Sequence, residues 1–148
     1  MFESILIPTD GSSTSDKAIE KGLELARLAG ARVTFLHVLE NPLVSGYATP
    51  EAMPYAAQLY QDLRASGDQI LQEAKARAEA LGVAATTRLV EDADPVKAIV
   101  EASKDHDAVV MGTHGRRGFN RWMFGSVAEG ALRRADKPFL MVRGPEEE

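Results

Sequence analysis

Residues 4–12 read Ser4-Ile5-Leu6-Ile7-Pro8-Thr9-Asp10-Gly11-Ser12, and they indicate the class of fold. Its first four residues are nearly all apolar instead of alternating with polar ones, which is typical of a strand covered on both faces. Pro8 closes the strand, and the residues after it supply a turn and a choice of helix N-caps. The stretch therefore predicts a central parallel strand followed at once by a helix.

The same alternation of a short apolar strand and a longer helical pattern continues along the 148-residue chain. Further strands are predicted at 33–39, 86–90, 108–111 and 138–142, and helices at 18–29, at 59–81, from Asp94-Pro95 onward and at 126–135. We predict an α/β fold, a single domain over residues 1–148. It is an open, doubly wound, Rossmann-like parallel sheet of five strands with helices on both faces.

Local signals refine this prediction. Gly30 stands where a left-handed residue ends a helix, and Asp94 can cap a helix whose first residue is Pro95. Residues 41–55 contain three prolines and a glycine and are predicted to be irregular, with their role open. Gly67 is a weak point inside the long helix that follows.

The composition excludes several classes of protein. Without cysteine the chain has no disulfide, thiolate zinc site, iron–sulfur cluster or cysteine nucleophile. No apolar run approaches the roughly 18 residues of a membrane helix, and the N-terminus lacks the features of a signal peptide. A net charge of −5 argues against nonspecific nucleic-acid binding. We expect a cytoplasmic protein with neither a membrane nor a nucleic-acid partner.

The segment after the fourth predicted strand carries the chemistry; residues 112–126 read GTHGRRGFNRWMFGS. Its glycines let another group approach the backbone closely, and the helix that begins at Gly125-Ser126 offers N–H groups and a dipole that favour phosphate. Residues 112–137 carry six basic and two acidic side chains. In an open α/β sheet, ligands bind outside the carboxyl ends of the strands. The residues therefore predict a phosphate-binding loop at the mouth of the sheet.

The glycine spacing matches neither GxxxxGK[ST] nor GxGxxG. It is G-x2-G-x9-G-[ST], which resembles the ATP-binding subgroup of the universal stress protein family. The likeness extends to the Pro8-Thr9-Asp10-Gly11-Ser12 turn, to His37-Val38 and to Lys137-Pro138, and so covers essentially the whole chain. It implies that family's fold, ATP as ligand with or without Mg²⁺, and a homodimer formed through the last strands.

The resemblance also implies which residues hold the nucleotide. The adenosine would be bordered by Pro8, Thr9 and Asp10 and by the backbone around Val38, and the ribose would lie over Met111 and Gly112. The phosphates would be surrounded by Gly115, Gly125, Ser126 and Val127, with His114, Arg116 and Arg117 as further binding residues in the same loop.

Simpler structural roles remain open at several of these positions. Asp10 can be only a turn residue, or it can contact the ligand and a divalent metal on the phosphates. Ser126 and Glu129 form the pattern of a capping box, which leaves other N–H groups for a phosphate. His37 is predicted to be a hydrogen-bonded position in the sheet and His106 a surface residue. No residue is assigned as catalytic or as a dedicated metal ligand.

The resemblance and the residues lead to one preferred function and two alternatives. The preferred function is a nucleotide-dependent regulatory or signalling protein of the stress response, because the loop offers binding groups without an evident general base. The first alternative is a slow ATPase or an adenylate-handling enzyme of a related α/β type, and the second is a scaffold whose nucleotide is structural. The residues do not separate ATP from ADP, AMP or a cyclic nucleotide.

Residues 139–142 form a short apolar strand whose exposed edge invites pairing with a second copy.

Overall fold

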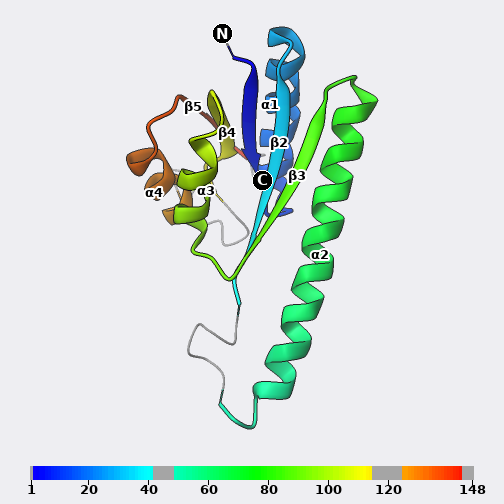
Figure 1. Ribbon diagram of the computed structural model, residues 1–148, viewed down its shortest axis with the longest axis vertical. Coiled ribbons are helices and arrows are strands. Elements are labelled where there is room, and N and C mark those ends of the chain that lie inside the picture. Colours follow the sequence, from blue (N-terminus) through cyan, green and yellow to red (C-terminus); the bar gives the residue numbers. More distant parts are fainter. Residues whose placement is uncertain (1, 42–48, 115–124, 145–148) are drawn as a thin grey trace.

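The computed structural model describes residues 2–41, 49–114 and 125–144 (Figure 1). The five strands are β1 (Ser4–Pro8), β2 (Arg32–Leu39), β3 (Ala85–Glu91), β4 (Ala108–Gly112) and β5 (Phe139–Val142). The four helices are α1 (Ser13–Ala29), α2 (Met53–Ala80), α3 (Pro95–Ser103) and α4 (Ser126–Arg134). Strands and helices alternate as the sequence predicts.

The strands form one parallel sheet in the order β3-β2-β1-β4-β5. The chain winds outward from β1 to β3 and then returns to place β4 on the other side of β1. The predicted doubly wound topology is therefore confirmed, and the strand order reverses between β1 and β4. Such a switch point is where open α/β sheets bind ligands.

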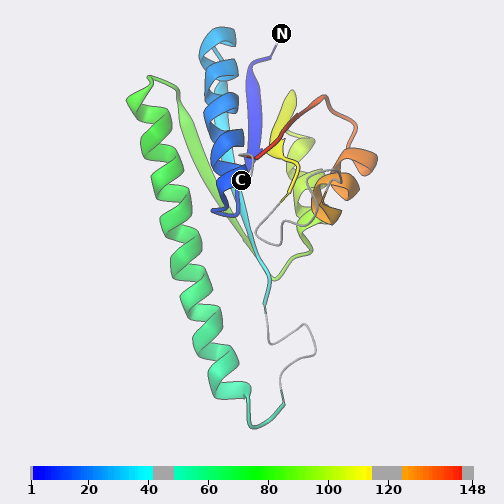
Figure 2. The same ribbon diagram turned by 180° about the vertical axis from the view of Figure 1, so that it is seen from behind.

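The helices cover both faces of the sheet, with α1 and α2 on one face and α3 and α4 on the other (Figures 1 and 2). Each face has its own apolar core. Ile5 and Ile7 of β1 point toward α1 and α2, whereas Leu6 points toward α3 and α4, and all three are fully buried. Burial on both faces explains the unbroken apolar run of β1.

The start of β1 is fixed to the start of β4 by a single carboxylate. Asp107 Oδ2 accepts hydrogen bonds from the backbone N–H groups of Glu3 at 2.8 Å and Ser4 at 3.1 Å. These bonds stabilise the charged form and hold the pKa of Asp107 below its usual value. The amino ends of the two central strands are thereby joined.

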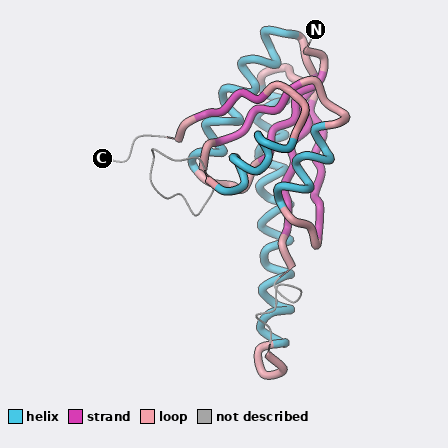
Figure 3. The backbone as a smooth tube through the Cα atoms, turned by 90° about the vertical axis from the view of Figure 1, so that its left-hand side faces the viewer, coloured by secondary structure: helices cyan, strands magenta, loops and turns pink. Residues whose placement is uncertain are grey.

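The long helix α2 begins earlier than predicted. Its first residue is Met53, so the prediction that all of residues 41–55 are irregular is wrong for their last part. Pro54 is compatible with the helix because it lies in the first turn, where its missing N–H has no helical partner to lose. The buried residues of α2 are Gly67, Leu71, Ala74 and Ala78, all in its second half, and its first half extends beyond the strands (Figure 3).

Two of the local signals are confirmed. Gly30 ends α1 in the left-handed conformation, with φ of 69°. Asp94 caps α3 by accepting a hydrogen bond from the Lys97 N–H at 3.0 Å, and Pro95 is the first residue of that helix. None of the helices in the described part of the chain is long and apolar enough to cross a membrane.

The prediction that His106 is a surface residue is wrong. The side chain is only 5% exposed. Its Nδ1 lies 2.7 Å from the Ala102 carbonyl oxygen and its Nε2 lies 2.9 Å from Thr34 Oγ1. The neighbours Asp105 and Asp107 suggested a solvated loop, but the ring between them turns inward. Burial lowers the pKa of His106, an effect that the bond to Ala102 only partly opposes.

The lowered pKa of His106 predicts a pH-dependent stability. Between the usual histidine pKa of about 6.5 and the lower folded value, the unfolded chain binds the proton more readily, so stability falls as pH decreases. One proton gives a slope of at most about 1.4 kcal/mol per pH unit. Urea unfolding from pH 8 to pH 5 should show that His106→Gln removes this part of the slope. An unchanged slope in the variant would contradict the assignment.

Candidate functional site

The candidate site lies at the carboxyl ends of β1 and β4, where the strand order reverses. Pro8 ends β1 and Gly112 ends β4, so the loops that follow both strands leave the sheet side by side. All the described residues that the sequence assigns to the site lie at this edge or at the start of α4, which follows it. The fold thus brings together loops that are about 100 residues apart in the chain.

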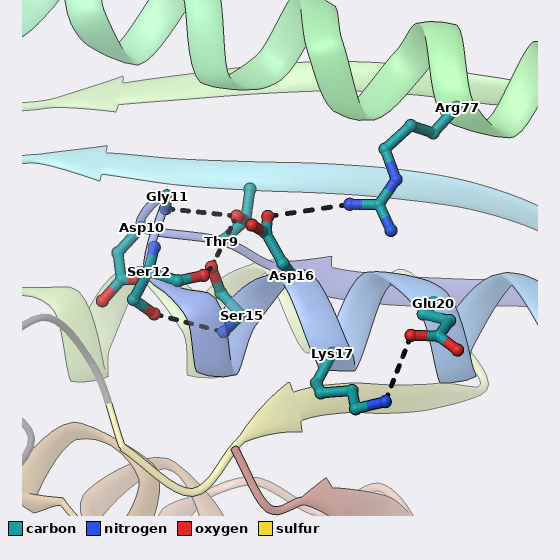
Figure 4. A network of polar contacts seen from close by, with 9 residues as sticks. All are labelled: Thr9, Asp10, Gly11, Ser12, Ser15, Asp16, Lys17, Glu20 and Arg77. Carbon is teal, nitrogen blue, oxygen red and sulfur yellow. Dashed lines mark hydrogen bonds and ion pairs between the residues drawn. The ribbon is translucent and has the colours of Figure 1, made fainter. Parts of the chain in front are cut away.

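The loop after β1 is held by a network of short polar contacts (Figure 4). Asp10 Oδ1 accepts a hydrogen bond from the Ser12 N–H at 3.0 Å, so Asp10 does act as a turn residue. Ser12 then caps α1 by accepting from the Ser15 N–H at 3.1 Å. Gly11, which lies between Asp10 and Ser12, has φ of 79°, a conformation that favours glycine. The carboxylate of Asp10 is therefore fixed in place at the end of β1.

The loop after β1 also borders helices α1 and α2 on one face of the sheet. Arg77 of α2 reaches Asp16 of α1, with Nη1 3.6 Å from Oδ1. A hollow of about 180 Å³ lies between the two helices and the loop, with a lining of Thr9, Gly11, Asp16, Ile19, Ile70, Glu73, Ala74 and Arg77. It lies on the opposite face of the sheet from α4.

β2 extends past the end of β1: Pro8, the last residue of β1, pairs with Leu36, whereas β2 continues to Leu39. The Leu36 carbonyl accepts from the Thr9 N–H on the β1 side, and the Leu39 carbonyl accepts from the Asp92 N–H on the β3 side. Backbone groups of successive residues in a strand alternate between the two sides. The N–H and C=O of Val38 are therefore directed to the β1 side, beyond the last residue of β1.

Two backbone hydrogen bonds fix the two ends of the segment from Thr113 to Gly125, which is called the glycine loop below. The Thr113 N–H donates to the Val142 carbonyl at 2.9 Å, and the Gly125 N–H donates to the Thr113 carbonyl at 2.7 Å. Gly125 is thereby held against the end of β4. Thr113, which sequence reasoning did not single out, is the residue that joins these parts, and it is 3% exposed. Gly115, Arg116 and Arg117 lie outside the described residues.

The predicted capping box at the start of α4 is wrong. The N-cap is Gly125, which has no side chain, and Ser126 is already the first helical residue, one position too late to cap. Glu129 pairs instead with Arg133, with Oε1 2.9 Å from Nη2. No side chain of the described residues caps this helix. Its first N–H groups are therefore not used by a capping side chain, which is the state that an anion-binding helix end requires.

Three of the predicted site residues share one apolar cluster beside this helix end. Met111 belongs to the buried core under α3 and α4, and Val38 and Val127 pack against it while remaining partly exposed. The edge thus combines an apolar floor, the polar loop after β1, and the N-terminus of α4. This combination suits a ligand with an apolar ring and an anionic group.

Residues 1–143 match the sequence profile described as the Universal stress protein family. The chain belongs to that family. Universal stress protein MJ0531 of Methanocaldococcus jannaschii is 33% identical over 150 residues, which cover 100% of this chain and 86% of the relative. A universal stress protein of Burkholderia pseudomallei has a solved structure that is 34% identical, with a TM-score of 0.74 and 95% of each chain covered. A universal stress protein solved in complex with cAMP is 26% identical, with a TM-score of 0.65, and covers 96% of this chain and 97% of its own.

In this universal stress protein, the first glycine of the motif has a packing role. A Cβ atom added to Gly112 would lie 2.7 Å from Cγ2 of Thr14, on the first turn of α1. Thr14 is also in close contact with the position that a Cβ of Gly144 would take. The conformation of Gly112 is not left-handed, so the close approach of α1 is what requires glycine here.

The described residues contain no group of three or more His, Cys, Asp or Glu side chains that could hold a metal ion. His114 is half-buried, and its Nδ1 lies 3.0 Å from Thr113 Oγ1. The side chain of His114 is thus held close to the base of the glycine loop.

The packing of Thr14 against Gly112 predicts a specific loss of stability. Gly112→Ala should lower the free energy of unfolding by about 1–3 kcal/mol, because the added methyl group overlaps Thr14 Cγ2. The double variant with Thr14→Ser, which lacks that carbon, should recover most of the loss, while Thr14→Ser alone serves as the control. Urea unfolding measures all four proteins. Equal losses in the Gly112→Ala single and double variants would refute this packing role.

Proposed function

We propose that this universal stress protein binds ATP at the carboxyl edge of the sheet and acts in the cytoplasm as a nucleotide-dependent regulatory or signalling protein of the stress response. The observation that carries the proposal is the start of α4. Its N-terminus has no capping side chain and is joined through Thr113 to the end of β4, next to the loop after β1. This is an anion-binding helix end at a topological switch point.

The geometry supports a position for each part of the nucleotide. The backbone groups of Val38 point past β1 and can pair with the adenine edge, while Pro8, Thr9 and Asp10 border the adenosine. Met111 and Gly112 lie at the end of β4, beneath the proposed ribose position. The phosphates would meet Gly125, Ser126 and Val127, with His114 nearby and with Gly115, Arg116 and Arg117 contributing from outside the described residues.

Two further points favour ATP over an uncharged nucleoside. A relative of the same fold is solved with cAMP, which supports recognition of an adenine nucleotide. Residues 112–125 carry three arginines and no acidic side chain in a chain of net charge −5, so this segment adds positive charge next to the helix end that would meet the phosphates. A Mg²⁺ ion would be held mainly by phosphate oxygens, with Asp10 as the protein group at that edge.

Direct titration tests the proposal. Calorimetry with ATP should give measurable binding, and Gly125→Val should weaken it at least tenfold, because the isopropyl group would occupy the space in front of the α4 N–H groups. Gly125 has φ of −63° and ψ of 157°, which any residue can adopt, so the variant should fold. Arg134→Gln, at the other end of α4, is the control.

Absence of binding at millimolar ATP would refute the proposal. Parallel titrations with ADP, AMP and cAMP rank the phosphate requirement. Phosphate release at about one turnover per second or faster, lost in Asp10→Ala, would favour the enzyme alternative over a regulatory role.

The second part of the proposal is a homodimer formed by antiparallel pairing of β5 from two copies. β5 is an edge strand, and Leu140 on it is 45% exposed. A hollow of about 470 Å³ lies beside it, with Leu28, itself 88% exposed, in its lining. An exposed edge with apolar side chains is a ready surface for strand pairing.

The dimer has its own test. Leu140→Glu should convert the protein to a monomer, because two carboxylates would meet near the twofold axis at an apolar edge. Leu132→Glu, on α4 and 39% exposed, introduces the same charge at a similar exposure and should leave the dimer intact. Light scattering at micromolar concentration measures both. A monomeric wild-type protein would refute the dimer.

A further inference from the structure

His37 connects three parts of the molecule at the proposed adenosine position. It lies near the end of β2, directly before Val38. Its Nδ1 lies 2.8 Å from the carbonyl oxygen of Thr9 in the loop after β1. On its other side the imidazole faces α2, where a Cβ added to Gly67 would lie 2.7 Å from Cδ2 and 3.1 Å from Nε2. The predicted role of His37 as a hydrogen-bonded sheet position is therefore confirmed. In addition, its ring contacts both the loop after β1 and helix α2.

The direction of the bond to Thr9 is fixed by chemistry. A carbonyl oxygen only accepts, so Nδ1 of His37 must carry the hydrogen. Thr9 is then held at all of its polar groups. Its N–H donates to the Leu36 carbonyl at 2.8 Å, its Oγ1 donates to Ser15 Oγ at 3.1 Å, and its carbonyl accepts from His37. Thr9 is 5% exposed, so an unpaired carbonyl there would be costly.

The contact with Gly67 couples the same ring to α2. A helix can approach a ring this closely only where it carries no Cβ, and Gly67 is buried in the middle of α2. Any larger side chain at position 67 would have to move the ring or the helix. The glycine that looked like a weak point of the helix is thus the position at which α2 rests on His37.

We propose that His37 is the positioning residue of the adenosine subsite: its Nδ1–H fixes the Thr9 carbonyl, and so the Thr9–Asp10 turn, while Gly67 of α2 fixes the ring. The inference rests on the proposed nucleotide binding and adds to it that the placement of α2 controls affinity. A shift of α2 by a partner or by substitution would reach the ligand through this ring.

A matched pair of variants isolates the hydrogen bond. In His37→Asn, the amide Nδ2 occupies nearly the place of Nδ1 and still donates to Thr9. In His37→Leu, a methyl group of similar size occupies that place and cannot donate. ATP affinity should stay within about threefold of wild type in His37→Asn and fall at least tenfold in His37→Leu. A general packing role for the ring predicts similar losses in both variants.

Gly67→Ala tests the second contact. It should weaken ATP binding in the wild-type background, because the methyl group displaces the ring from Thr9, and have little further effect in His37→Leu, where the bond is already lost. Calorimetry is done for every variant well below its midpoint of thermal unfolding, so that only folded protein is titrated. Additive losses would show that the two residues act separately and would overturn the inference.

The outcomes for this inference differ from those for the proposed function. Wild-type protein that binds ATP, together with His37→Leu that binds it equally well, overturns the positioning role and leaves the nucleotide site standing. Wild-type protein that binds no nucleotide overturns the proposed function and the inference with it. Selective loss in His37→Leu, with recovery in His37→Asn, supports both.

Discussion

The position of β1 between β2 and β4 governs how the other strands and the loops of the candidate site are placed. β1 is buried on both faces, and its register with each neighbour is fixed, with Asp107 joining its start to that of β4. Because the chain leaves β1 toward β2 and returns beside it as β4, two loops distant in sequence emerge side by side. The apolar residues of β1 thus determine where the polar groups of the neighbouring loops can converge.

The site is assembled from parts that the fold already holds rigidly. Thr113 joins β4, β5 and α4 through backbone hydrogen bonds, and Thr14 fills the space beside Gly112. The proposed phosphate binding does not by itself explain every glycine of the motif. Gly112 is required by the approach of α1, whereas Gly125 serves as a helix cap without a side chain.

The sequence predicts the order and kind of the described strands and helices because the apolar runs of the strands and the helical spacing between them are strong, local signals. It also predicts which loops meet, since parallel strands place their carboxyl ends at one edge. The sequence predicts burial, helix starts and helix caps less well where a tertiary contact determines them. The polar neighbours of His106 suggest a surface position although its ring is buried, and the prolines of residues 41–55 suggest an irregular segment although α2 begins at Met53. Ser126 fits a capping pattern, but the Gly125 carbonyl already accepts the first helical hydrogen bond, from the Glu129 N–H, so Gly125 is the cap.

An adenine nucleotide is proposed to bind at the carboxyl edge between β1 and β4. The most direct test is a titration of ¹⁵N-labelled protein with ATP, followed through the backbone amide resonances in two-dimensional NMR spectra. Binding at this edge predicts saturable shifts concentrated at Thr9, Asp10, Val38, Gly112 and Ser126, with little change at the amino ends of the strands. Shifts concentrated elsewhere, such as at the hollow beside β5, or no shifts at millimolar ATP, would contradict it.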